Sequence, residues 1–169
     1  MAHPFAGKRI AVVMGGLSAE REVSLNTGVG VVKALVDKGW DAVAIDWTER
    51  TNLAAELTAM GAGAVWNALH GTWGEDGAVQ GLCACLRIPC TGSGILASAL
   101  AMDKVMSKRI FESNHLPTPR WQLLPHAAPS GTDEVAAVAA FGMPSVVKPA
   151  NEGSSVGVSI VEKADDIAP

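Results

Sequence analysis

The feature of this sequence that most constrains its fold is the alternation of short apolar runs with segments of helical periodicity. Residues 9–14 (RIAVVM) form a β-branched run that ends at a glycine pair, and leucine and valine then recur at helical spacing from Ser24 to Gly39. The runs at 41–47 and 64–70 are each followed by another helical pattern. This alternation predicts a parallel sheet with helices on both faces. Further elements are expected as helices at 53–60 and 77–87 and a short strand at 88–91.

The pattern changes after Gly94. One long helix is expected over 95–113, followed by an extended turn at 116–119, because proline restricts the residue before it. Beyond it we expect strands at 121–124, 144–149 and 156–161, a helix at 133–141 and the start of another helix over 164–169. Two strands joined by a glycine- and serine-bearing loop favour an α+β unit with antiparallel pairing. We therefore expect one domain over 1–95 and the first, incomplete part of a second over 96–169.

Composition excludes several classes of protein. Hydrophobic residues make up 49% of the 169 residues and charged ones 18%, which is typical of a packed core and not of a disordered chain. Thirteen Lys and Arg against seventeen Asp and Glu give a net charge of -4 with no block of like charge. A binder of duplex nucleic acid or of an anionic membrane would need a basic stripe. The apolar stretches are too short for a membrane span or a signal-peptide core, so we expect a cytoplasmic protein.

Three cysteines lie close together in the sequence, at Cys83, Cys85 and Cys90. Their spacing contains no Cys-x-x-Cys pair, and no His-x₃₋₅-His segment accompanies them, so a tetrahedral zinc site is not indicated. Reduced, buried thiols are the expected state, and we expect all three to react slowly in the folded protein.

Two glycine-bearing segments follow predicted strands and are candidates for a ligand site. Residues 15–24 (GGLSAEREVS) come directly after the first strand, where open parallel sheets bind ligands, but they lack the Gly-x-Gly-x-x-Gly fingerprint of dinucleotide sites. Residues 68–77 end the third strand, and His70 is expected to point toward the same crevice as Glu20. The alternatives are a helix start at which Glu20 and Glu22 favour the helix dipole, and a plain surface loop.

A third candidate segment lies near the end of the chain. Lys148 is expected on a strand and is followed by residues 152–155 (EGSS), whose backbone N–H groups and hydroxyls could close over phosphate oxygens. The pattern is not a Walker motif, because Gly157 is followed by valine. The alternative is an ordinary hairpin with a solvated lysine. Lys104, taken alone, is expected to be a solvated charge on the face of a helix.

Taken together and in order, these segments resemble the D-alanine–D-alanine ligase family of the ATP-grasp fold. The resemblance runs through GGLSAEREVSLNTG (15–28), NALHGTWGEDGAVQG (67–81), TGSGILASALAMDK (91–104) and VVKPANEGSSVGVS (146–159). It implies a Rossmann-like parallel sheet of the pre-ATP-grasp type, followed by the start of an α+β ATP-grasp nucleotide domain. Family members are about twice as long, so the likeness is to their N-terminal half.

The resemblance implies an ATP-dependent ligase that joins two D-alanines through an acyl phosphate for peptidoglycan precursors. By resemblance, Glu20 holds the ammonium of the first D-alanine and His70 lines the substrate crevice. The residues it implicates are Glu20, His70 and Ser154 in catalysis and Lys104, Lys148, Glu152, Gly153, Ser154 and Ser155 in nucleotide binding. It also implies Mg²⁺ (or Mn²⁺) with ligands outside this chain, no metal ligand within it, and a homodimer.

Two other functions remain open. Another ATP-grasp carboxylate–amine ligase or carboxylase would share Lys148 and the glycine loop but not the segments around Glu20 and His70. A non-catalytic half-protein that docks on a partner is the second. For the chain alone we expect no activity and exposed apolar side chains on the two last strands, at Val146, Val147, Val158 and Ile160.

Overall fold

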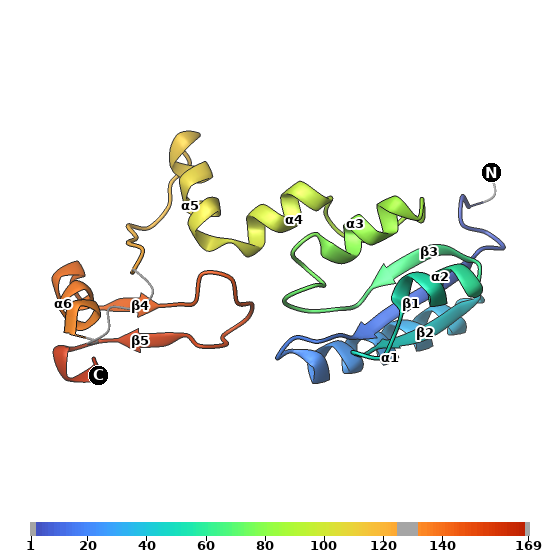
Figure 1. The fold of residues 1–169 in the computed structure, drawn as a ribbon, viewed down its shortest axis with the longest axis horizontal. Coiled ribbons are helices and arrows are strands. Elements are labelled where there is room, and N and C mark those ends of the chain that lie inside the picture. Colours follow the sequence, from blue (N-terminus) through green and yellow to red (C-terminus); the bar gives the residue numbers. More distant parts are fainter. Residues whose placement is uncertain (1–2, 125–131, 168–169) are drawn as a thin grey trace. The chain divides into compact units, whose positions relative to one another are not determined.

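The chain folds into two compact units, Met1–Met102 and Asp103–Pro169, which are described separately. The computed structural model describes residues 3–124 and 132–167 (Figure 1). Within these residues, no helix has both the length and the apolar character needed to cross a membrane.

A three-stranded parallel sheet forms the centre of the first unit, in the order β2-β1-β3. Its strands are β1 (Arg9–Gly15), β2 (Ala42–Trp47) and β3 (Ala62–Asn67). The predicted parallel sheet is thus confirmed, although β3 ends before His70. The side chain of Asn67 explains this end: it accepts a hydrogen bond from the N–H of Leu69 at 3.1 Å and donates one to the carbonyl of Gly74 at 2.7 Å, which closes a turn.

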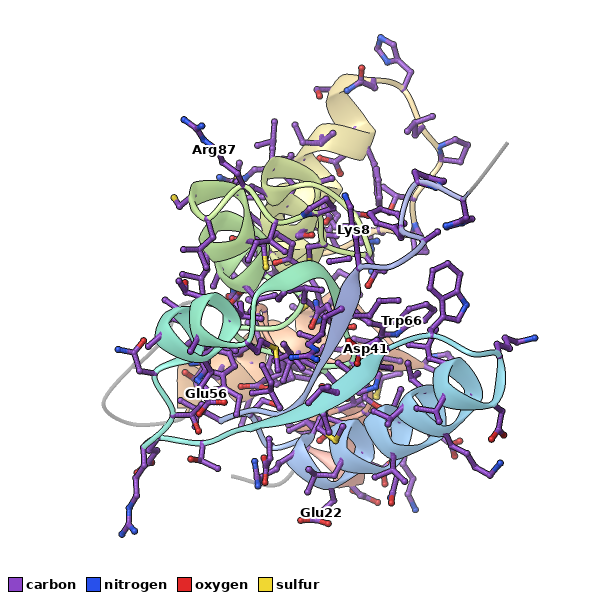
Figure 2. All side chains as sticks on the ribbon, turned by 90° about the vertical axis from the view of Figure 1, so that its right-hand side faces the viewer. Lys8, Glu22, Asp41, Glu56, Trp66 and Arg87 are labelled. Atoms are coloured by element: carbon purple, nitrogen blue, oxygen red, sulfur yellow. The ribbon has the colours of Figure 1, made fainter. Side chains whose placement is uncertain are left out.

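Helices cover both faces of this sheet, as the alternation predicted. The helices are α1 (Arg21–Asp37), α2 (Leu53–Ala59) and α3 (Ala78–Cys85). Ala11 and Val13 of β1 belong to one buried cluster with α2 and α3, while Val12 and Met14 belong to a second cluster with α1. Figure 2 shows Glu22 on α1 and Glu56 on α2 pointing outward from the ribbon. The alternating side chains of β1 therefore hold two separate cores together.

The packing of α1 differs from what its apolar pattern suggests. Val29 and Val36 are 64% and 52% exposed, and the residues of α1 that are buried are Ser24 and Gly28. A Cβ atom added to Gly28 would lie 2.5 Å from the Cβ of Met14. The helix therefore approaches β1 through small residues, and its valines line a shallow apolar hollow beside β2.

The short strand expected at 88–91 is reduced to a single parallel bridge between Val65 and Cys90. The N–H of Val65 donates to Pro89 O at 2.8 Å, and the N–H of Thr91 donates to Val65 O at 3.0 Å. Pro89 has no N–H, and the N–H of Ile88 is bonded to Cys83 O at 2.9 Å. The ladder does not extend toward residue 88, because Pro89 lacks the N–H that would donate to β3.

The single long helix expected over 95–113 is wrong. The structure has α4 (Ile95–Met102) and α5 (Lys104–Ser113), separated by Asp103. Asp103 has extended backbone angles, and its carboxylate accepts a hydrogen bond from the N–H of Met106 at 2.9 Å. It is thus an N-cap that starts a new helix.

The second unit contains α5 and an antiparallel strand pair, which confirms the expected pairing. Its other elements are α6 (Thr132–Phe141), β4 (Ser145–Val147), β5 (Ser159–Val161) and the 3₁₀ turn η1 (Ala164–Asp166). Residues 168–169 of the helix expected from 164 lie outside the described part. Val146 and Ile160 face each other across the pair and are 51% and 67% exposed, while Val147 and Val158 are half-buried.

The strand expected at 121–124 is also wrong, because these residues have no strand partner in the described structure. The side chain of Trp121 is directed instead toward α5, where its Nε1–H donates to Glu112 Oε1 at 2.7 Å. A tryptophan that suggested a strand therefore anchors an irregular segment to a helix.

The cysteines differ in exposure. Cys83 is buried and Cys90 half-buried, but Cys85 is exposed, so the expectation of three buried thiols is wrong for Cys85. A hydrogen bond with Cys90, together with burial, raises the pKa of the Cys83 thiol. The same hydrogen bond lowers the pKa of Cys90. Within the described residues, no group of three possible ligands could hold a metal ion.

Thiol labelling of the native chain should therefore distinguish these cysteines. Iodoacetamide should modify Cys85 rapidly and leave Cys83 unmodified until denaturant is added, because a buried, protonated thiol is a poor nucleophile. Peptide mass spectrometry measures the modification at each position. Rapid native modification of Cys83 would contradict the packing described for α3.

Candidate functional site

A tight turn connects β1 to α1 at the carboxyl edge of the sheet. Gly15 and Gly16 both have φ near +80°, a conformation that side-chain-bearing residues rarely adopt. Arg21, the first residue of α1, clasps this turn: its guanidinium donates to Gly16 O at 3.3 Å and Trp47 O at 3.0 Å and pairs with Asp46 at 2.8 Å. The hydrogen bond to Asp46 raises the pKa of Arg21. The start of α1 is thus fixed to the end of β2.

Ser24 joins the two candidate segments of the first unit. It is fully buried; its Oγ accepts a hydrogen bond from the N–H of Gly15 at 2.9 Å and donates one to Ala68 O at 2.8 Å. One hydroxyl therefore links the end of β1, the helix α1 and the segment after β3.

Replacing Ser24 by alanine should destabilise the first unit. The change removes both hydrogen bonds and leaves a buried N–H and a buried carbonyl without this partner, at a cost of about 1–3 kcal/mol each. Urea denaturation followed by circular dichroism measures the change. An unaltered midpoint would show that water or a backbone shift replaces the hydroxyl.

Glu20 and His70 are brought onto adjacent segments. The Oγ of Ser18 donates to His70 O at 2.7 Å and accepts from the N–H of Glu20 at 3.1 Å. A Cβ atom added to Gly71 would lie 2.9 Å from Glu20 Oε2, so the carboxylate lies against the residue next to His70.

The Glu20 carboxylate does not cap helix α1. Glu20 occupies the N-cap position of α1, yet its side chain makes no capping hydrogen bond. It is half-buried, and among residues 3–124 and 132–167 no hydrogen bond or ion pair engages its carboxylate. A half-buried carboxylate of this kind can act as counter-charge to a small cation such as an ammonium group.

The ring of His70 lies between the side chains of Thr27 and Glu75. Its Nε2 lies 3.1 Å from Thr27 Oγ1 on α1, and its Nδ1 lies 4.0 Å from Glu75 Oε1. The other oxygen of Glu75 accepts from the N–H of Gly71 at 2.8 Å. Asp76, not Glu75, accepts from the N–H of Ala78 at the start of α3.

Sequence reasoning missed four of these residues as parts of the site, namely Ser18, Arg21, Ser24 and Thr27. All four lie within GGLSAEREVSLNTG (15–28), the segment that the family resemblance singled out. Helical spacing could have placed Ser24 and Thr27 on the face of α1 near Glu20, since residues three and four apart are neighbours on a helix.

The other candidate residues belong to the second unit. Lys104 begins α5; its N–H donates to Ala150 O at 3.0 Å, and its ammonium group donates to the backbone carbonyl of Glu152. Lys104 is thus bound to the loop between β4 and β5 and is not simply a solvated charge.

Lys148 and the two serines of this loop are exposed. Nowhere in the described residues does the Lys148 ammonium form a hydrogen bond or ion pair. Ser154 has φ +52°, in the left-handed region, and Gly153 O accepts from the N–H of Val156 at 3.3 Å. Within the described residues, the loop therefore presents hydroxyls and a nearby cation that form no hydrogen bond or ion pair.

Comparison with known proteins agrees with this arrangement. The family model described as "D-ala D-ala ligase C-terminus" matches residues 110–169. The D-alanine–D-alanine ligase of Anaeromyxobacter dehalogenans is 48% identical over 167 residues, which cover 98% of this chain and 52% of that protein. Over nearly its whole length, the chain is therefore similar to D-alanine–D-alanine ligases. The enzyme of Albidiferax ferrireducens is 51% identical over 157 residues, or 93% of this chain and 44% of that protein.

Solved structures confirm the fold class. The D-alanine–D-alanine ligase of Bacillus anthracis matches with a TM-score of 0.79 and 39% identity over 95% of this chain and 51% of that one. A structure of the Bacillus anthracis ligase complexed with ATP matches with a TM-score of 0.71 and 34% identity over 95% of this chain and 52% of that one. The chain spans about half the length of the ligases that it matches.

Proposed function

We propose that this chain forms part of an ATP-dependent ligase that joins two D-alanine molecules. The observation that carries the proposal is the juxtaposition of Glu20 and His70 beyond the carboxyl ends of β1 and β3, in a relative of D-alanine–D-alanine ligases. That edge of a parallel sheet is where such folds bind small molecules.

In the proposed reaction, a carboxylate oxygen of the first D-alanine bonds to the γ-phosphorus of ATP as the bond to ADP breaks. The nitrogen of the second D-alanine, having lost a proton, then attacks the acyl carbon, and inorganic phosphate leaves. The protein contributes mainly by positioning the reactants and stabilising charge.

The first unit would hold the first D-alanine. Glu20 provides the counter-charge for its ammonium group, and His70 lies beside Glu20 through the Ser18 hydrogen bonds. Ser24 and Arg21 keep these segments in place.

The second unit would hold the nucleotide. Its donors suit phosphate oxygens: the Lys148 ammonium is exposed, the Ser154 and Ser155 hydroxyls are exposed, and Lys104 braces the loop at Glu152. We propose the same loop, Glu152–Ser155, as the element that closes over the phosphates.

The family resemblance also implies Mg²⁺. The described residues do not fit a site for it, since they contain no group of three possible ligands. We propose that its ligands lie outside this chain, that the complete protein is a homodimer, and that it acts in the cytoplasm.

A coupled assay tests the proposed function. The protein that contains this chain, expressed over the length of its relatives, should release phosphate and form D-alanyl-D-alanine when given ATP, Mg²⁺ and D-alanine. The 169-residue chain alone should do neither. Phosphate release with another carboxylate and amine, but not with D-alanine, would favour a different carboxylate–amine ligase.

The assay also addresses the docking function. A complete protein that forms no product but binds a partner chain through Val146 and Ile160 would favour a non-catalytic module.

A further inference from the structure

The hydrogen bonds around His70 determine which of its ring nitrogens carries the proton. Thr27 has one hydroxyl hydrogen and two oxygen lone pairs. Its Oγ1 lies 2.9 Å from Val23 O, four residues earlier in α1, and 3.1 Å from His70 Nε2. A carbonyl oxygen can only accept, so the hydrogen of Thr27 points to Val23 O. The contact with His70 must then be donated by Nε2–H.

The opposite arrangement is unfavourable. If the hydroxyl donated to an unprotonated Nε2, two oxygen lone-pair regions would face each other at 2.9 Å between Thr27 and Val23. The back-bond from a threonine hydroxyl to the carbonyl four residues earlier is also a recurrent helix feature.

We propose that Thr27 is a positioning residue that holds His70 as the Nε2–H tautomer and leaves Nδ1 as the ring nitrogen available to a ligand. This inference deepens the proposed function, on which the ligand's identity rests. Nδ1 is the nitrogen beside Glu75, at 4.0 Å, which is beyond hydrogen-bonding distance. The side chain of His70 is 32% exposed, so the ring is accessible.

The Thr27 hydroxyl acts on the same segment as the Ser24 hydroxyl. Thr27 lies one helical turn beyond Ser24, whose hydroxyl links α1 to Ala68, two residues before His70. The two hydroxyls act on the same segment: Ser24 fixes its backbone, and Thr27 fixes its ring.

Nitrogen NMR tests the tautomer directly. In the ¹⁵N-labelled 169-residue chain, at a pH where imidazoles are neutral, long-range ¹H–¹⁵N spectra distinguish the protonated ring nitrogen from the bare one. The His70 signals are assigned by their loss in His70→Gln. We expect one tautomer with the proton on Nε2, and a proton on Nδ1 in the unaltered chain overturns the proposal without any variant.

Variants then test the role of Thr27. Thr27→Val keeps the shape but removes the hydroxyl, so His70 should lose its single-tautomer signature and give a mixture. Thr27→Ser should restore it. Thr58→Val is the matched control, because Thr58 makes the same back-bond on α2, to Ala54 O at 2.8 Å. It should leave His70 unchanged.

Unchanged His70 signals in a folded Thr27→Val chain would overturn the positioning role. The exposed ring of His115 provides an internal reference in every spectrum. The readout needs neither ATP nor D-alanine, so its failure is distinct from failure of the ligase assay.

Discussion

Replacing Lys148 by methionine should raise the apparent KM of the proposed ligase for ATP about 30-fold to several thousand-fold, or abolish turnover. The fold should stay intact. Removing one partner of a desolvated charge pair costs about 2–5 kcal/mol, and each 1.4 kcal/mol is tenfold. The fold should survive because Lys148 is exposed and its ammonium has no partner in the part of the chain that the structure describes. Initial rates against ATP concentration, with circular dichroism, measure both effects.

Two variants sharpen this test. Lys163→Met removes another exposed lysine, just beyond β5, and should leave the apparent KM for ATP unchanged. Lys104→Met should instead disturb the loop, since its ammonium is bonded to Glu152 O. Normal ATP kinetics in a well-folded Lys148→Met enzyme would remove Lys148 from the nucleotide site.

The sequence predicted the layout of the first unit because its signals are local. Apolar runs, glycine stops and helical spacing correctly indicated β1, β2 and the three helices around them. At two places in the second unit where the prediction was wrong, one hydrogen bond decided the outcome. The Asp103 carboxylate caps a new helix, and the Trp121 indole binds Glu112 instead of joining a sheet.

The site was less predictable than the fold. The sequence predicted that the segments of Glu20 and His70 would be neighbours, because both follow strands whose carboxyl ends meet at one edge of a parallel sheet. The helical spacing of valines in α1 did not predict that Ser24 and Gly28 are its buried residues and that Val29 and Val36 are exposed. That packing is what brings small hydroxyl-bearing residues, rather than bulky ones, against the His70 segment.

Replacing Glu20 by glutamine should weaken the binding of D-alanine to the proposed ligase about 10- to 150-fold. The binding of ATP should change much less. A hydrogen bond to a charged group contributes about 1.5–3 kcal/mol, and glutamine keeps the shape but not the charge. Saturation curves for D-alanine at fixed ATP, and the reverse, separate the two constants.

The matched control for this prediction lies two residues further along the same helix start. Glu22 is an exposed acidic residue in the first turn of α1, so Glu22→Gln removes the same charge from the same helix end. If Glu20 acted only through its charge near the helix dipole, both variants would weaken D-alanine binding to the same extent. A specific ammonium contact predicts an effect for Glu20 alone. His70→Ala should likewise spare ATP, and loss of ATP affinity with normal D-alanine saturation in either variant would place these residues in a different site.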